Sequence, residues 1–281
     1  MSQREVLAGA LRELGWIEGR NLTLEVRFAG VDPERQRQAA AALKALPVAV
    51  IVAPGSGAIR AAREGAPGVP IVMVYAGDAR GSGFVASLAQ PGGDLTGTSA
   101  AGEEVLAKQL ELLAATVPAL KRVGVLMNPA NAANDFFLRA ISVRARELGV
   151  EVERIDVAAP AELDAAVGRA RGGGLIVLGD PMFTQQRSRL VDAVRRAGVP
   201  AVYGGREYVV EGGLMSYLSP SAWHWRRAGH FVDKILRGAS PASLPVEQPT
   251  AFELTINVKT ARALGLAIPQ SLLLRADEVI E

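Results

Sequence analysis

Residues 12–15 read Arg-Glu-Leu-Gly, and residues 146–149 read Arg-Glu-Leu-Gly again. Each run closes an amphipathic helix and opens a similar succession of apolar and turn signals. The succession ends at Gly-Val-Pro in residues 68–70 and again in residues 198–200. A pattern repeated on this scale predicts two halves built on one design.

Each half is predicted to alternate strands and helices. Short apolar runs rich in Val and Ile are typical of strands covered on both faces, and helices between them imply right-handed crossovers. The expected strands are 22–28, 48–52 and 71–75 in the first half, and 150–157, 175–178 and 201–203 in the second. The predicted fold is α/β, with parallel sheets in two Rossmann-like lobes.

The second half begins with a piece that the first half lacks. Residues 122–131, RVGVLMNPAN, predict a strand and loop before the second Arg-Glu-Leu-Gly helix, whereas Met1 already falls at or inside the first such helix. By symmetry, the first strand and loop of the first half are missing. We therefore expect a chain that is truncated or that fills the gap with another segment.

Composition narrows the possible functions. The 281 residues carry 31 basic and 29 acidic side chains, a net charge of +2, with no basic stripe of the kind that nucleic-acid binding needs. The absence of cysteine removes disulfides and thiolate chemistry. The N-terminus is charged and amphipathic rather than signal-like, so no signal peptide is predicted in this chain.

Turn-rich stretches divide the predicted lobes. Residues 90–97 and 212–220 are rich in Gly and Pro, and a third crossing is expected near Thr250. The expected boundaries are 1–97 with 219–250 for lobe 1, and 98–218 with 251–281 for lobe 2.

Ligands of open parallel sheets bind beyond the carboxyl ends of the strands. This rule selects five loops: 54–57, 76–78, 128–131, 179–183 and 204–208. The loop with Ser56 and Gly57 runs directly into a helix expected at residues 58–63, whose free N–H groups favour an anion such as a carboxylate, although the glycines can equally serve close packing.

Carboxylates and aromatic side chains occur in the same loops. Asp78 and Asp180 can pair with a ligand ammonium group or cap a turn or helix. Five aromatic residues at or near these strand ends suit an apolar or aromatic ligand in a chain with only 5% aromatic residues: Tyr75, Phe183, Tyr203, Tyr208 and Tyr217. Tyr75 and Tyr203 can instead be the last core residues of their strands.

The sequence contains few groupings of residues that could carry out catalysis. Both histidines, His224 and His230, lie six residues apart on one predicted helix and are expected to be surface or packing residues. Ser56 is not in a GxSxG elbow, and no phosphate-binding fingerprint occurs. We expect no enzyme activity, no cofactor and no metal site.

Over nearly its whole length the chain resembles the ABC-transporter substrate-binding proteins of the tryptophan/tyrosine type. The residues that carry the resemblance are LRELGWIEGRNLTLEVRFAGVDPER (11–35), GVPIVMVYAGDARGSGFVASLAQPGGDLTG (68–97), RVGVLMNPANAAN (122–134), GVPAVYGGREYVVEGGLMSYLSP (198–220) and residues 245–281, which begin PVEQPTAFELTINVKTA. The resemblance implies a type I periplasmic binding protein-like fold, with two lobes that close over a small ligand.

The resemblance also implies site residues and partners. It places Ser56 and Gly57 near a ligand carboxylate, Asp78 in the first lobe, and Asn131 and Asp180 in the second, with Tyr208 and Tyr217 near the mouth or hinge. The implied partners are an amino acid and a membrane ABC permease, for a monomer in the periplasm or on the outer membrane surface. Where relatives commonly have Gly-Asp-Pro-Val, residues 77–80 read Gly-Asp-Ala-Arg.

The main hypothesis is a solute receptor of an ABC importer that captures an amino acid, aromatic or otherwise, or a similar small organic solute between its lobes. The alternatives are the ligand-sensing domain of a regulator and a Rossmann-like enzyme.

Overall fold

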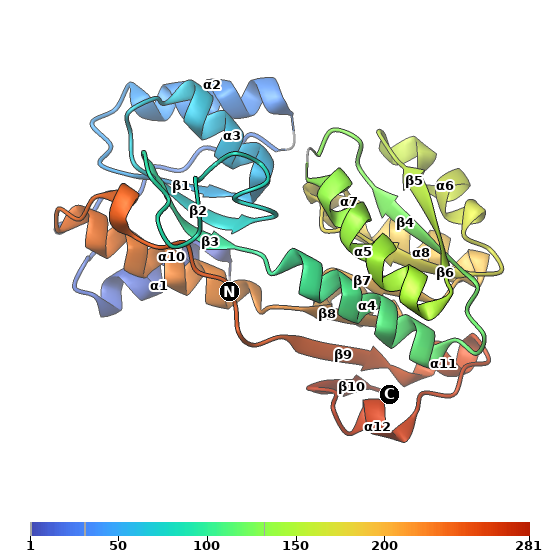
Figure 1. Cartoon of the computed structure of the whole chain (residues 1–281). Helices are drawn as coiled ribbons and strands as arrows, with labels where there is room; N and C mark the ends of the chain where they lie inside the picture. The colour runs from blue at the N-terminus through green and yellow to red at the C-terminus, as the bar shows by residue number, and fades with distance from the viewer. Residues whose placement is uncertain (1, 31, 132) are drawn as a thin grey trace. The chain divides into compact units, whose positions relative to one another are not determined.

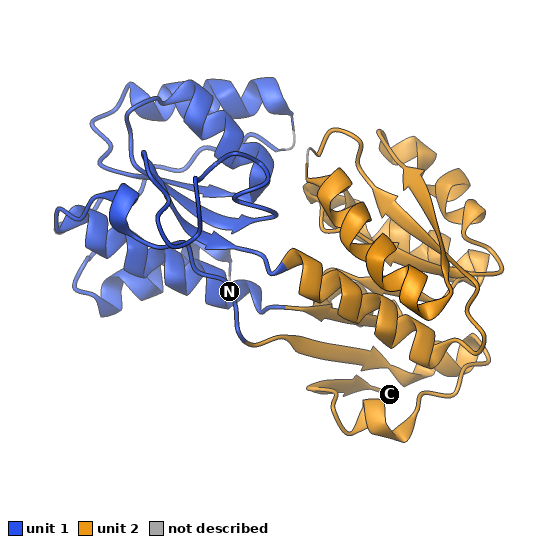
Figure 2. Ribbon diagram, viewed as in Figure 1, with its two compact units in different colours: residues 1–101, 219–250 blue, residues 102–218, 251–281 orange. Residues whose placement is uncertain are grey.

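The computed structural model describes residues 2–30, 32–131 and 133–281. The chain divides into two compact units, residues 1–101 with 219–250 (unit 1) and residues 102–218 with 251–281 (unit 2) (Figure 2). In the described ranges, no helix is both long and apolar enough to cross a bilayer.

Unit 1 contains a parallel sheet in the order β1-β2-β3 (Figure 1). Alternate residues of β2 point to opposite faces: Ile71 and Met73 join one core with α3, and Val72 and Val74 join another with α1 and α10. The elements are α1 (Gln3–Glu13), α2 (Pro33–Lys44), β1 (Ile51–Pro54), α3 (Gly55–Gly65), β2 (Ile71–Ala76), β3 (Leu95–Ser99), α10 (Ser221–Leu236) and η2 (Pro241–Ser243).

Unit 2 contains a sheet in the order β10-β9-β8-β7-β6-β4-β5. Helices α4 and α5 pack on one face and α6 and α8 on the other. The elements are α4 (Gly102–Thr116), β4 (Arg122–Met127), α5 (Asn134–Leu148), β5 (Glu151–Asp156), η1 (Pro160–Glu162), α6 (Leu163–Arg169), β6 (Gly174–Val177), α7 (Pro181–Gln185), α8 (Arg187–Ala197), β7 (Ala201–Tyr203), α9 (Arg206–Val210), β8 (Met215–Leu218), β9 (Glu253–Asn257), α11 (Val258–Ala263), α12 (Gln270–Leu273) and β10 (Glu278–Ile280).

The α/β class with mainly parallel sheets is confirmed. The exception is the pair β8 and β9, which is antiparallel. The chain leaves unit 2 after Leu218, at the end of β8, and returns just before β9, so the two strands run in opposite directions.

The prediction of a strand at residues 22–28 is wrong. Only an isolated bridge joins Leu22 to Glu18, and no strand follows it. The equivalent strand of unit 2, β5, pairs with β4 alone. The described residues of unit 1 contain no counterpart of β4, so residues 22–28 have no strand to pair with and β1 lies at the edge of its sheet.

Residues 90–97 do not act only as a linker. Leu95, Thr96 and Gly97 already belong to β3, where they pair with Ile71, Val72 and Met73 of β2. The first crossing between the units therefore falls after Ala101 rather than after Gly97.

Candidate functional site

In unit 1, a side chain joins the loops that follow β1 and β2. The hydroxyl of Ser56, in the first turn of α3, accepts a hydrogen bond from the Gly77 N–H at 3.2 Å. The turn into α3 requires φ of +77° at Gly55, a value that glycine adopts without strain. The sequence therefore brings two of the predicted loops together at the carboxyl ends of neighbouring strands.

The start of α3 has a polar neighbour in α2. A Cβ atom at Gly57 would lie 3.2 Å from Oε1 of Gln36, whose amide donates to the Gly30 carbonyl at 2.8 Å. Pro54, the N-cap residue, makes no side-chain hydrogen bond to the helix. The first N–H groups of a helix have no partner within it, so this end of α3 is suited to an anionic group.

Asp78 shapes its own loop. Its Oδ1 accepts the Gly81 N–H at 2.8 Å, and a Cβ atom at Gly81 would lie 1.8 Å from its Oδ2. The carboxylate is half-buried. Of the two functions open to Asp78 on sequence grounds, the structure shows the turn cap.

Tyr75 ends β2 in an uncommon conformation. Its φ is +60°, and the ladder with β3 is irregular between Met73 and Ala76. The Tyr75 N–H donates to Oγ1 of Thr98 at 3.1 Å, so a side chain of β3 satisfies the backbone at this irregularity.

His224 lies directly beside Tyr75. Its ring is 4.6 Å from the Tyr75 ring, edge to face, and it is only 1% exposed. Nδ1 is 3.0 Å from Thr98 Oγ1, and Nε2 is 2.8 Å from Ser219 Oγ. Burial lowers the pKa of His224 to about 4, so the ring is neutral at physiological pH. Of the two expectations for His224, surface or packing, the structure shows packing.

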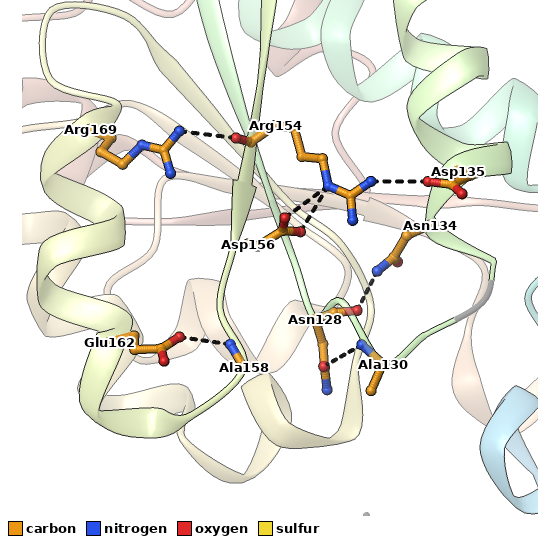
Figure 3. Close-up of polar contacts among 9 residues, drawn as sticks. All are labelled: Asn128, Ala130, Asn134, Asp135, Arg154, Asp156, Ala158, Glu162 and Arg169. Carbon is orange, nitrogen blue, oxygen red and sulfur yellow. Dashed lines mark hydrogen bonds and ion pairs between the residues drawn. The ribbon is translucent and has the colours of Figure 1, made fainter.

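In unit 2, the loop after β4 is folded by asparagines (Figure 3). Oδ1 of Asn128 accepts the Ala130 N–H at 3.0 Å, and the Asn134 amide donates to the Asn128 carbonyl. Oδ1 of Asn131 accepts the Ala133 N–H at 3.1 Å. The Asn131 side chain therefore bonds to the backbone just before α5, whose N-cap residue, Ala133, has no side-chain capping bond.

Asp180 connects this loop to the loop after β6. Its Oδ1 accepts the Met182 N–H at 2.8 Å as the N-cap of α7, and the Asn128 amide donates to the same oxygen at 3.3 Å. Only 7% of the residue is exposed, and this burial raises the pKa of its carboxyl group. Sequence reasoning placed Asn128 in a candidate loop without naming it as the partner of Asp180, since no local signal reports a contact 52 residues away.

The predicted aromatic residues differ in exposure. Phe183 is fully buried in the core against β6 and α8, which makes it a core residue with no surface for a ligand. Tyr208 is 3% exposed, stacks on Tyr203 at 5.1 Å, and places its hydroxyl 3.4 Å from Thr184 Oγ1. Tyr217 is half-buried and stacks on Phe252 at 5.6 Å. Of Phe183, Tyr208 and Tyr217, Tyr217 retains the most accessible ring.

The described ranges contain no group of three His, Cys, Asp or Glu side chains arranged to hold a metal ion. What each unit presents at its strand ends is a set of hydrogen-bonding and aromatic groups: Ser56, Gly57, Asp78 and Tyr75 in unit 1, and Asn128, Asn131, Asp180 and Tyr217 in unit 2. Such groups can bind a small polar molecule through its charged and aromatic parts.

Comparison with known proteins identifies the family of the chain. The model of the ABC transporter substrate binding protein family matches residues 2–280. A tyrosine-binding protein from Clostridioides difficile (strain R20291) is 24% identical over 259 residues, which cover 92% of this chain and 74% of that protein.

Two solved structures share the fold. A conserved domain protein from Vibrio cholerae O1 biovar El Tor superposes with a TM-score of 0.93 at 25% identity, over 99% of this chain and 94% of the other. An ABC domain from Streptococcus pneumoniae in complex with L-Trp gives a TM-score of 0.93 at 23% identity, with the same coverage of both chains.

The fold is that of a solute-binding protein. The chain belongs to the ABC transporter substrate-binding protein family.

Proposed function

We propose that this protein binds an aromatic amino acid and delivers it to the membrane permease of an ABC importer. The observation that carries the choice of ligand is the family match over residues 2–280 together with relatives described as tyrosine-binding and as an L-Trp complex. The family match also favours a receptor over the sensing domain of a regulator or an enzyme.

The unit 1 site supports the carboxylate end of such a ligand. The first N–H groups of α3 and the Ser56 hydroxyl offer donors to a carboxylate, and a partly buried helix terminus contributes up to about 2 kcal/mol. In unit 2, Asp180 offers a buried carboxylate to an ammonium group. An ammonium group close to Asp180 would oppose the effect of burial, since a neighbouring cation favours the charged form of the carboxyl group.

Substitutions that preserve local structure test these roles. Asp180→Asn keeps an oxygen that can accept from Met182 and Asn128 but removes the charge. We expect it to weaken amino-acid binding by about tenfold or more, because hydrogen bonds to charged groups are worth roughly 1.5–3 kcal/mol. Calorimetric titration with L-Tyr, L-Trp and L-Phe measures the loss.

Ser56→Ala is expected to weaken binding of the same ligands by about three- to tenfold. Ser243→Ala is the matched control, because Ser243 also makes a local hydrogen bond in unit 1, to the Ser240 carbonyl at 3.0 Å, far in sequence from the strand-end loops. Equal affinities in Ser56→Ala, Asp180→Asn and the parent protein would contradict both assigned roles.

The permease and the location also belong to the proposal. We propose that the native protein acts as a monomer in the periplasm or at the outer membrane surface, as family membership favours. Cell fractionation of the native gene product and light scattering of the purified protein test these two points. A cytoplasmic dimer would contradict both.

A further inference from the structure

Tyr75 packs against the core formed with α1 and α10, and its backbone has a strained conformation. It lies at the carboxyl end of β2, two residues before Gly77, whose N–H is bonded to the Ser56 hydroxyl. A φ of +60° costs a non-glycine residue roughly 1–2 kcal/mol. The neighbouring residues of β2 show no such strain among the described backbone angles.

The structure holds this strained residue in place with a buried polar network. One assignment satisfies every group: the Thr98 oxygen accepts the Tyr75 N–H, the Thr98 hydroxyl donates to Nδ1 of His224, and Nε2–H of His224 donates to Ser219. Thr98 is 0% exposed and Ser219 is 4% exposed, so three buried polar side chains fix the backbone and ring neighbour of Tyr75.

The rings around Tyr75 form an aromatic row, which consists of Tyr75, His224 and Trp223. The His224 ring meets Tyr75 edge to face at 4.6 Å and Trp223 edge to face at 4.8 Å. His224 is buried, whereas Tyr75 and Trp223 are both half-buried. The row therefore presents partly accessible aromatic surface at its two ends and a fixed ring in the middle.

A strained backbone, an irregular strand ladder and a buried polar network at one strand end are typical of a residue that is held in position to contact a ligand. The predicted site residue Ser56 and Gly77, in the selected loop 76–78, lie at the same end of the same sheet. We propose that Tyr75 is a specificity-determining residue whose ring contacts the aromatic side chain of the ligand, and that His224 is the residue that positions it. This inference rests on the proposed function and names the part of unit 1 that selects aromatic amino acids.

The test compares the affinity for aromatic ligands with the affinity for aliphatic ligands in each variant. Tyr75→Asn removes the ring, and asparagine tolerates positive φ, so the backbone is retained. An aromatic contact is worth roughly 0.5–1.5 kcal/mol, so Tyr75→Asn is expected to weaken L-Tyr and L-Trp binding by about two- to tenfold more than it weakens L-Leu or L-Met binding. Tyr75→Phe keeps the ring and is expected to retain the selectivity of the parent protein. Trp16→Leu removes a half-buried ring elsewhere in unit 1 and serves as the control for general loss of packing.

His224→Gln tests the positioning role. Glutamine can still hydrogen-bond but cannot provide the ring, so the ratio of aromatic to aliphatic affinity is expected to fall while α10 remains folded by circular dichroism. An equal loss for aromatic and aliphatic ligands in Tyr75→Asn, or no loss, would overturn the inference and leave the receptor function intact. A parent protein that binds only aliphatic amino acids would overturn both the inference and the aromatic ligand of the proposed function, and one that binds no amino acid would also overturn the amino-acid receptor function.

Discussion

Among the described residues, Tyr203 has a buried hydroxyl without a hydrogen-bond partner. It is fully buried at the end of β7, and in the described part of the chain its oxygen has no partner. A buried hydroxyl without a partner costs roughly 1–3 kcal/mol. We expect Tyr203→Phe to leave the free energy of unfolding unchanged or to raise it by about 1 kcal/mol, as measured by urea denaturation.

Tyr208→Phe is the matched control, because its hydroxyl lies 3.4 Å from Thr184 Oγ1 and burial raises its pKa to about 12. We expect this substitution to lower stability slightly. A loss above about 1 kcal/mol in Tyr203→Phe would mean that the Tyr203 hydroxyl has a partner.

The buried ring of His224 is expected to make the free energy of unfolding depend on pH. Its pKa falls from 6.5 to about 4 on folding because burial penalises the charged ring. The unfolded chain therefore binds a proton at a pH where the folded chain does not. The contribution of neutral His224 is complete above pH 6.5 and is lost as the pH falls toward 4.

Between pH 7 and pH 4.5 the loss from His224 is about 2–3 kcal/mol, at 1.36 kcal/mol per pH unit below the unfolded pKa. Urea denaturation at both pH values measures it. His224→Gln should show a smaller fall over the same interval. A fall of the same size in the variant would assign the pH dependence to other groups.

At the scale of the element, β2 and β3 approach each other at Gly97. Its φ is +128°, and a Cβ atom there would lie 2.2 Å from the Met73 carbonyl oxygen. Gly97→Ala is expected to lower the free energy of unfolding by at least about 2 kcal/mol, because both backbone strain and a backbone clash oppose it.

Gly9→Ala is the control for this substitution. Gly9 lies inside α1, and a Cβ atom there would meet no atom of another element within 4 Å, so alanine should raise stability by up to about 1 kcal/mol. Gly97→Ala with unchanged stability would contradict the close approach of β2 and β3.

Residues 22–28 and β5 are expected to differ in the rate at which their amides exchange hydrogen. β5 pairs with β4 along six residues. Residues 22–28 form no ladder, and Phe28 at their end is 95% exposed. We expect amides 23–28 to exchange with little protection and those of β5 to be protected, as measured by mass spectrometry. Strong protection of 23–28 would show that they pair with a strand.

The contrast between residues 22–28 and β5 shows how far a sequence pattern can predict a strand. Alternation of apolar and polar side chains at Leu22, Leu24, Val26 and Phe28 is a sound strand signal. A strand also needs a neighbour, and the sequence reports the missing neighbour only through comparison of the two halves. In contrast, β4, β6 and β7 could be predicted from their continuous runs of apolar residues, because strands that are buried on both faces have this pattern.

The site was less predictable than the fold. The strand-end rule selected the loops of Ser56, Asp78 and Asp180, and the structure places these residues just after β1, β2 and β6. The rule did not separate Phe183, which is fully buried, from Tyr217, which is not, since both are aromatic residues near strand ends. The network of Thr98, Ser219 and His224 joins segments up to 126 residues apart and leaves no local signal.

At the scale of the whole molecule, the segments that leave unit 1 are bonded to one another within that unit. The Ser99 N–H donates to the Glu247 carbonyl at 2.9 Å, and the Gln248 amide donates to the Ala100 carbonyl at 3.1 Å. The side chain of His224 joins Thr98 to Ser219. Each of the three crossings, after Ala101, Leu218 and Thr250, is thus fixed on its unit 1 side.

The central claim is that the chain binds an aromatic amino acid, and calorimetric titration of the full chain with each of the twenty amino acids tests it most directly. We predict saturable one-to-one binding of L-Tyr, L-Trp or L-Phe. At a ligand concentration 100 times the Kd, the stabilisation of about 2.7 kcal/mol should raise the Tm by roughly 5–10 °C. No heat and no change in Tm with L-Tyr, L-Trp and L-Phe would contradict the claim, whichever of the other amino acids bind.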